Sequence, residues 1–203
     1  MVDLFNYTRR ASSVAHIGSL DLGGDNPVRI QSMTTTNTND TEACIHQAEE
    51  IIKAGGELVR FTTQGSREAE NMKNINAGIR ADGYLTPLVA DVHFNPNVAD
   101  VAALYCEKVR VNPGNYVDPA RKFIKQEYTD EEYAHELQKI EDRFVPFLNI
   151  CKENHTAIRI GVNHGSLSDR IRNRYGDTPE GIVESCMEFL RICKKENFHD
   201  VVI

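Results

Sequence analysis

The chain has 203 residues, which is enough to bury a sizeable core and corresponds to one domain or occasionally two. Its formal net charge of −7 argues against a general nucleic-acid surface, and it contains no apolar run of about eighteen residues that could cross a membrane. The first residues lack the basic and apolar regions of a signal peptide, and the five cysteines are scattered without a CxxC pair. These features predict a cytoplasmic protein whose thiols are reduced and pack in the core.

A small hairpin is predicted first, from two short apolar stretches at residues 14–17 and 19–22 that flank Gly18. After it, one unit repeats along the chain: an apolar strand, a polar or glycine-containing loop and an amphipathic helix. The strands are expected at residues 28–33, 58–63, 88–93, 108–112, 157–162 and 200–203, and the last stretch looks like the start of a strand.

Capping residues indicate where the helices between these strands begin. The helices are expected to start near Asp40, at Ser66, at Asn95–Pro96, at a capping box formed by Thr129 and Glu132, and at Thr178–Pro179. The fourth helix is expected to bend near Pro146, because proline cannot donate the backbone hydrogen bond of a helix interior.

Alternating strands and helices indicate a parallel sheet. Six such strands fit either an open doubly wound sheet or most of an eight-stranded barrel. Polar residues lie at or just beyond the carboxyl end of nearly every strand, and in a barrel all these ends converge on one site. In a doubly wound sheet, only the ends at the switch point do so. We therefore expect an α/β fold with a (β/α)8 TIM-type barrel, of which this chain holds about six strands, and a hairpin that closes the N-terminal mouth.

Three of the predicted strands carry an arginine inside a short apolar run, namely Arg60, Arg110 and Arg159. A buried arginine is costly unless something pairs with it, and parallel strands of such folds are covered on both faces. In an acidic protein, arginines gathered on one inner surface predict an anion site, and their planar forks suit diphosphate oxygens. The alternative is that they face solvent. Since side chains alternate between faces, we expect shared faces for Arg60 with Thr62, Asp91 with His93, Arg110 with Asn112, and Arg159 with Asn163.

Four motifs follow one another in the chain: IQSMT at residues 30–34, ADVHFNP at 90–96, VRVNPGN at 109–115 and IRIGVNHGSL at 158–167. Together they closely resemble the family of 4-hydroxy-3-methylbut-2-enyl diphosphate synthase, which performs the penultimate step of the non-mevalonate isoprenoid pathway. The resemblance covers the chain from about Arg9 to its end. The long link at residues 116–154 is similar to the larger form of the enzyme, found in plants and some bacteria.

The resemblance implies an oxidoreductase whose N-terminal barrel binds 2-C-methyl-D-erythritol 2,4-cyclodiphosphate. In this family a C-terminal domain carries a [4Fe-4S] cluster, held by three cysteines and a glutamate. Flavodoxin or ferredoxin supplies two electrons, which open the cyclic diphosphate and remove a hydroxyl group.

The resemblance also implies site residues in this sequence. The substrate-binding residues are Arg60, Arg110, Asn112, Arg159, Asn163, Ser32 and Ser166. The catalytic residues are Asp91 and His93. Gln31 and Arg170 also match positions of the family, whereas Arg29 has no counterpart and is expected to be exposed or to form a salt bridge.

For Asp91 and His93 a structural role stays open beside the functional one. Asp91 either contacts the substrate or pairs with a neighbouring arginine of the barrel, and His93 is either catalytic or a hydrogen-bonded core histidine. The two cannot hold zinc alone, because no third ligand has a suitable spacing.

The chain departs from the family in what it lacks. The family's later barrel residues and its cluster domain have no match, and none of the five cysteines lies where the family has a cluster ligand. We expect one partial barrel domain, residues 1–203, with residues 1–26 as an N-terminal segment and hairpin, that binds no cluster and is inactive alone. An open barrel leaves strand edges unpaired, so a homodimer joined near the first and last strands is expected. The alternative function is a metal-free phosphate-binding barrel module or a pterin-type barrel synthase.

Overall fold

The computed structural model describes residue 6, residues 10–118 and residues 127–203. Expectations for residues 1–5 and for part of the link after residue 116 lie outside these ranges. Within the described ranges, no helix is both long enough and apolar enough to cross a membrane.

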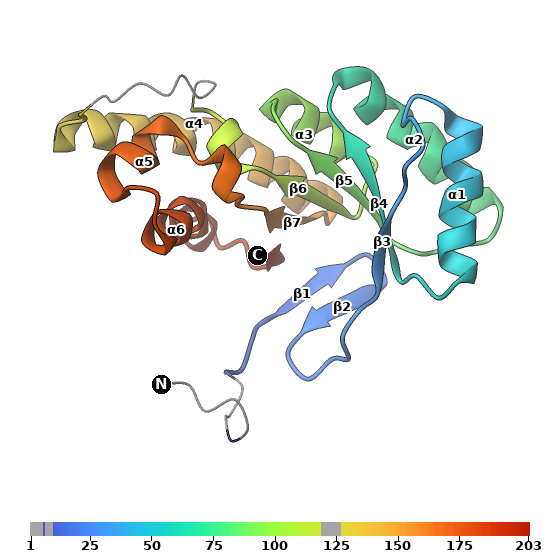
Figure 1. Cartoon of the computed structure of the whole chain (residues 1–203). Coiled ribbons are helices and arrows are strands. Elements are labelled where there is room, and N and C mark those ends of the chain that lie inside the picture. The colour runs from blue at the N-terminus through green and yellow to red at the C-terminus, as the bar shows by residue number, and fades with distance from the viewer. Residues whose placement is uncertain (1–5, 7–9, 119–126) are drawn as a thin grey trace.

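A parallel sheet of six strands forms the centre of the molecule (Figure 1). Its strands pair in the order in which they occur in the sequence. This order has no switch point, which is the arrangement of a barrel and not of a doubly wound sheet. In the described part of the chain the first and last strands do not pair with each other, so the sheet is open. The strands are β3 (Gln31–Met33), β4 (Leu58–Thr63), β5 (Leu88–Val92), β6 (Lys108–Val111), β7 (Ala157–Ile160) and β8 (Val201–Val202).

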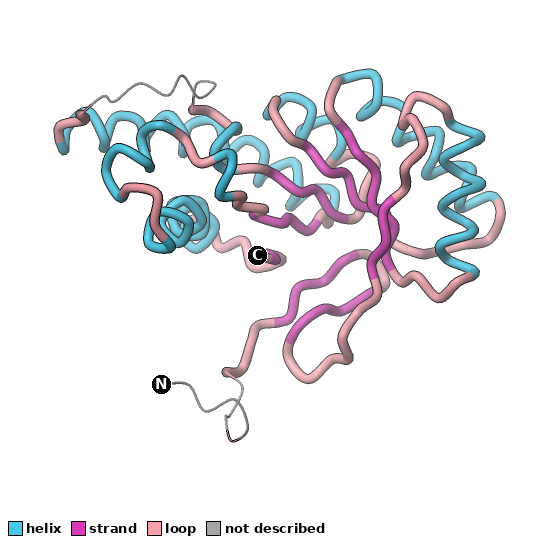
Figure 2. Tube along the Cα trace, in the orientation of Figure 1, coloured by secondary structure: helices cyan, strands magenta, loops and turns pink. Residues whose placement is uncertain are grey.

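The helices lie along one face of this sheet, as Figure 2 shows. Strand side chains that point outward, such as Phe61, Val109 and Ile158, pack with helix residues such as Met72 and Phe144 into the main core. The helices are α1 (Thr41–Lys53), α2 (Ser66–Ala81), α3 (Pro96–Ala102), α4 (Asp130–Asn154), α5 (Asp169–Tyr175) and α6 (Pro179–Lys195). Two 3-10 turns, η1 (Pro113–Asn115) and η2 (His164–Ser166), follow β6 and β7.

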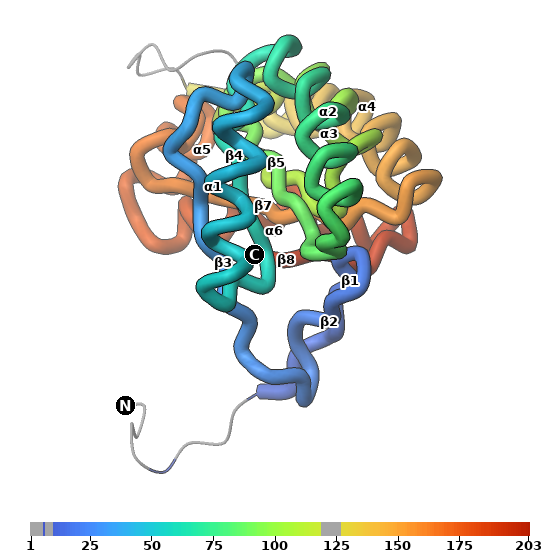
Figure 3. The backbone as a smooth tube through the Cα atoms, turned by 90° about the vertical axis from the view of Figure 1, so that its right-hand side faces the viewer, coloured from blue at the N-terminus to red at the C-terminus, as the bar shows by residue number. Residues whose placement is uncertain are grey.

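The predicted hairpin is confirmed as β1 (Val14–Ile17) paired antiparallel with β2 (Leu20–Gly23). It lies at the end of the sheet where the strands begin (Figure 3). Ile17 is fully buried there, in a small second core with Leu58 and Ala157, which are the first residues of β4 and β7. The hairpin therefore covers the inner face at its amino-terminal end, as expected from the sequence.

The first strand of the sheet is shorter than predicted, because Val28 is 89% exposed and the ladder begins only at Gln31. The side chain of Glu57 accepts a hydrogen bond from the backbone N–H of Ile30 at 2.9 Å and pairs with Arg29 at 2.9 Å. A side chain thus takes the place of a strand partner at this point. The same pair confirms the salt bridge expected for Arg29.

The residue that caps α2 also differs from the prediction. Gly65, not Ser66, is the residue before the first turn, and the Glu68 carboxylate accepts hydrogen bonds from the backbone N–H groups of Gly65 and Gln64. The acidic side chain of the first turn does the capping that was expected of a serine hydroxyl.

Candidate anion-binding site

The pairing register brings the three strand arginines to the inner face of the sheet. Asp91 lies beside Arg110 on the neighbouring strand, and Arg110 lies beside Arg159 on the next. Arg60 lies opposite Val89, which is two residues before Asp91 on β5. The alternation predicted from the sequence is confirmed, since the outward neighbours of these residues belong to the main core.

Asp91 is the centre of this face and is completely buried. Its Oδ2 accepts a hydrogen bond from Arg60 Nε at 2.9 Å, and its Oδ1 accepts one from Arg110 Nη1 at 3.1 Å. His93 Nε2 lies 3.1 Å from Oδ2. Both oxygens of the carboxylate are thus occupied by protein groups, which is the pairing arrangement left open above.

The electrostatics keep this carboxylate ionised. Burial by itself raises the pKa of Asp91, but the hydrogen bond from His93 and the charges of Arg110 and Arg60 outweigh burial and hold that pKa below its usual range. A single buried anion therefore orients two guanidinium groups.

Arg110 reaches across β7 because residue 161 is a glycine. Its Nη2 donates to the Gly161 carbonyl oxygen at 2.7 Å, and a Cβ placed on Gly161 would lie 2.1 Å from Arg110 Nε. That Nε is buried and has no hydrogen-bond partner among the described residues. The guanidinium thus keeps one donor that the protein does not satisfy.

Two further cations on this face have no carboxylate partner. Arg159 is partly exposed, and its side chain makes no ion pair or hydrogen bond within the described ranges. Lys108 is only 3% exposed, and its Nζ donates to Gln31 Oε1 at 3.1 Å. Burial and the nearby charges of Arg159 and Arg60 lower the pKa of Lys108 to about 8. Among the described residues, this face therefore holds four cationic side chains but one carboxylate, Asp91, which pairs with Arg60 and Arg110.

Polar loop residues form the rim of the site at the carboxyl ends of β6 and β7. Asn112 Nδ2 donates to Ser166 Oγ at 2.9 Å, and that hydroxyl lies 3.0 Å from Asn112 Oδ1. Asn163 is exposed, and its Oδ1 accepts from the backbone N–H of Gly165 at 2.9 Å. A Cβ on Gly114 would lie 1.7 Å from the Ser166 carbonyl oxygen, so the two loops are in direct backbone contact.

Two residues implied by the resemblance are not brought to this group. Ser32 is exposed between Gln31 and Met33, and because Gln31 bonds to the inward-facing Lys108, strand alternation turns Ser32 to the other face. Arg170 is 2% exposed and is occupied by the carboxylates of Glu188 and Asp118. Its environment is that of a buried ion pair.

Sequence reasoning missed Lys108 and Gly161, although the signal was present. Lys108 stands two residues before Arg110, and Gly161 two residues after Arg159. The period of two that placed the arginines on the inner face places both of these residues there as well.

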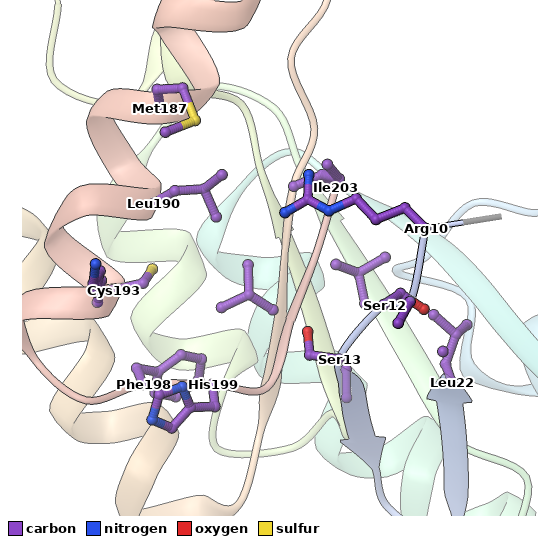
Figure 4. Close-up of a pocket in the computed structure, with 16 residues that line it drawn as sticks. Arg10, Ser12, Ser13, Leu22, Met187, Leu190, Cys193, Phe198, His199 and Ile203 are labelled. Atoms are coloured by element: carbon purple, nitrogen blue, oxygen red, sulfur yellow. The ribbon is translucent and has the colours of Figure 1, made fainter. Parts of the chain in front are cut away.

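A separate cavity of about 800 Å³ lies between the N-terminal segment and α6 with β8 (Figure 4). Its walls are mostly apolar and include Leu22, Leu190 and Phe198, and none of the inner-face arginines lines it. Arg10 and Lys194 also line this cavity, but it is separate from the arginines of the inner face. Among the described residues, no three histidine, cysteine or acidic side chains lie close enough together to hold a metal ion.

The chain is similar to known proteins over nearly its whole length. A model of the GcpE TIM-barrel domain matches residues 12–203. The chain is 75% identical over 202 residues to 4-hydroxy-3-methylbut-2-en-1-yl diphosphate synthase (flavodoxin) of Phocaeicola vulgatus, covering 100% of this chain and 33% of that protein. It is 66% identical over 199 residues to the protein of the same name from Parabacteroides distasonis, covering 98% of this chain and 33% of that protein.

The chain thus spans about a third of the length of the curated relatives that it matches. Among solved structures, dihydropteroate synthase from Xanthomonas albilineans is similar at 13% identity and a TM-score of 0.38, with 91% of this chain and 89% of that chain covered. A likeness at this level carries no weight for fold or function.

Proposed function

This chain belongs to the GcpE TIM-barrel family, and from that premise we propose that it is the substrate-binding part of a 4-hydroxy-3-methylbut-2-enyl diphosphate synthase. The whole enzyme is then an oxidoreductase of isoprenoid biosynthesis that reduces 2-C-methyl-D-erythritol 2,4-cyclodiphosphate. Family membership favours this function over the pterin-type synthase considered from the sequence.

The observation that carries the proposal is the surplus of positive charge on the inner face. Arg60 and Arg110 share the carboxylate of Asp91, and Arg159 has no ion-pair partner within the described ranges. Each phosphorus of a cyclic diphosphate retains one ionised oxygen, so the substrate is a dianion. Guanidinium forks bind such oxygens through charge-assisted hydrogen bonds.

The residues around the arginines have distinct proposed roles. Asn112, Asn163 and Ser166 supply polar contacts at the rim. Asp91, buried with both oxygens occupied, orients Arg60 and Arg110. The His93 side chain is 32% exposed, and its Nδ1 has no hydrogen bond within the described ranges, so it is the residue placed to exchange a proton with the substrate.

The described cysteines do not suit an iron–sulfur cluster. Cluster ligands are thiolates gathered at one place, whereas these thiols are spread over α1, α4, α6 and the segment before β6, and only Cys186 and Cys193 share an element. Burial raises the pKa of Cys193 to about 12 and also raises the pKa of Cys106 and Cys151. We therefore assign the [4Fe-4S] cluster to the part of the longer protein outside this chain. The names of the relatives indicate flavodoxin as the electron donor.

Substitution of Arg159 tests the proposal most directly, because no described residue pairs with this arginine and its removal strands no partner. In the full-length protein, Arg159→Met should weaken binding of the cyclic diphosphate about tenfold or more, since a charge-assisted hydrogen bond contributes roughly 1.5–3 kcal/mol. Isothermal titration calorimetry measures the affinity. Arg191→Met, on the exposed side of α6, is the matched control. Equal affinities of wild type and Arg159→Met would overturn the assignment.

A further inference from the structure

Lys108 is a buried cation that the proposed function does not use. It stands on the inner face of β6, two residues before Arg110, and is only 3% exposed. A buried ammonium group costs several kcal/mol unless a counter-charge compensates it. Within the described ranges Lys108 has an amide partner, Gln31, but no carboxylate.

The surroundings of Lys108 are apolar toward the amino-terminal ends of the strands and cationic toward their carboxyl ends. Its strand neighbours in the pairing register are Val89 on β5 and Ala157 on β7, which belong to the small core that contains Ile17 of the hairpin. Its Nζ crosses the interior to Gln31, on a strand that β4 and β5 separate from β6.

Every charged group that faces Lys108 belongs to the anion site. These groups are Arg60 on β4, Asp91 and His93 at the end of β5, Arg110 on β6 and Arg159 on β7. The single carboxylate among them already serves two arginines. The hairpin contributes apolar side chains, and β8 contributes Val202.

From this placement we propose that Lys108 is a fourth cation of the anion site, which supports a bound diphosphate by its charge from beneath the three arginines. The inference rests on the proposed function and extends it by one residue. The missing counter-charge of the lysine is supplied by the ligand. The ligand-free protein then holds a cation that is repelled by its neighbours, and the complex holds one that is attracted by an anion.

A proton is coupled to binding as a consequence. Repulsion from Arg159 and Arg60, together with burial, lowers the pKa of Lys108 to about 8 in the free protein. A bound dianion favours the protonated form and raises that pKa. Affinity is therefore highest below pH 8 and falls as the pH rises above it, because binding must then draw a proton from solution.

The test compares the full-length wild-type protein with Lys108→Met. Methionine has an unbranched side chain like that of lysine but carries no charge. The titrant is 2-C-methyl-D-erythritol 2,4-cyclodiphosphate, whose charge is constant between pH 7 and pH 9. At pH 7 the substitution should weaken binding about tenfold. A tenfold effect of the charge corresponds to a rise of the Lys108 pKa by one unit on binding, so the wild type should lose about fivefold in affinity between pH 7 and pH 9, and the variant should lose nothing.

A hydrogen-bonding role of Lys108 gives a different result. Gln31→Leu removes the bond to Nζ and leaves the charge. The affinity of Gln31→Leu for the cyclic diphosphate should depend on pH as that of the wild type does, even if its value at pH 7 differs. His93 and Asp91 are the same in all three proteins, so neither accounts for a difference between them.

Proton uptake by the wild type gives a reading that needs no variant. Calorimetry at pH 8.5 in two buffers of different ionisation enthalpy should report uptake of about half a proton per ligand bound, as a pKa that rises from about 8 to about 9 on binding requires. If uptake is zero, or Lys108→Met retains the pH dependence, the role of Lys108 is refuted while a weakened Arg159→Met still upholds the proposed function. If Arg159→Met binds as the wild type does, the proposed function itself fails.

Discussion

At the scale of single residues, Asp91 decides how the arginines are held. It is fully buried and bonded to Arg60, Arg110 and His93. Removing one member of a buried ion pair costs more than the pair contributes, because the remaining charge has no partner. In Asp91→Asn both guanidinium groups lose their counter-charge.

Asp91→Asn should therefore lower the free energy of unfolding of the ligand-free chain by about 3 kcal/mol, which urea unfolding at pH 7 measures. Asp177→Asn, at a half-exposed surface pair with Arg172, is the control and should change it by less than about 1 kcal/mol. Similar unfolding midpoints for the two variants would show that the carboxylate is not needed to hold the arginines.

The pH dependence of the same variant has a defined sign. The pKa of Asp91 is lower in the folded chain than its ordinary value, so the folded state favours the ionised form. The stability that this provides is present above the unfolded pKa of about 4 and is lost as the pH falls through the lower folded pKa. The difference in the free energy of unfolding between wild type and Asp91→Asn should thus become smaller below about pH 4. Between pH 5 and pH 7 this difference should be constant.

The inner-face residues show what a sequence can and cannot predict at this scale. Strand alternation alone placed Arg60, Arg110 and Arg159 on one face, and the structure confirms it. The bond between Arg60 and Asp91 joins residues 31 positions apart, and it depends on the pairing register of two strands. A register is set by packing of the whole sheet, which no local pattern specifies.

At the scale of elements, the strand–helix units of the barrel were predictable and their ends less so. β4 has the predicted bounds, whereas β3 is shortened by the side chain of Glu57. The helix α5 was not predicted, since its sequence offers one apolar residue, Ile171, among charged ones. Its stability comes from a tertiary contact, the burial of Arg170 against α6, and not from an apolar stripe.

This contact belongs to a network that joins four segments of the chain. Arg170 on α5 donates to Glu188 on α6 at 2.7 Å and to Asp118, beyond η1, at 3.2 Å. Tyr133 on α4 donates its hydroxyl to the same Glu188 oxygen at 2.6 Å. The network holds the loops after β6 and β7 against the outer helices, and these loops carry Asn112 and Ser166.

Glu188→Gln should lower the free energy of unfolding by about 3 kcal/mol, because Arg170 stays buried with only Asp118 to balance it. Glu184→Gln, one turn earlier on the same helix and paired with the exposed Arg191, is the matched control and should cost less than about 1 kcal/mol. Urea unfolding of both variants measures the difference. Equal costs would mean that the buried network contributes no more than a surface pair.

At the scale of the whole molecule, the open sheet determines how the isolated chain behaves. Each end strand of the described sheet, β3 and β8, has one edge that no other strand pairs. Exposed apolar side chains lie near both edges, namely Val28, Ile30 and Ile203. Unpaired edges of this kind are templates for pairing with another chain.

The chain of 203 residues should therefore associate in solution, with a dimer joined at these edges as the expected form. Light scattering over micromolar concentrations should give a mass that rises above the 22.9 kDa of one chain. Full-length protein serves as the comparison. A concentration-independent mass of one chain would contradict the prediction.

The family's barrel was predictable because four motifs and the polar strand ends agree on it, and the family match confirms that fold class. The open edges of the sheet were also expected from its six strands. The separate apolar cavity beside α6 was not, since it depends on how the N-terminal segment packs against β8. His16 of the hairpin donates its backbone N–H to Asp200 at 2.8 Å, a contact between residues 184 positions apart.

The strand order of the sheet also bears on how the chain folds during its synthesis. Each strand of the parallel sheet after β3 pairs with the strand made immediately before it, so each new unit can add to a surface that has already formed. Asp91 is made 31 residues after Arg60 and 19 residues before Arg110, an interval of seconds at about 5–20 residues per second. The carboxylate is therefore made before Arg110, and the nascent chain can begin to assemble the inner face before the ribosome has reached Arg159.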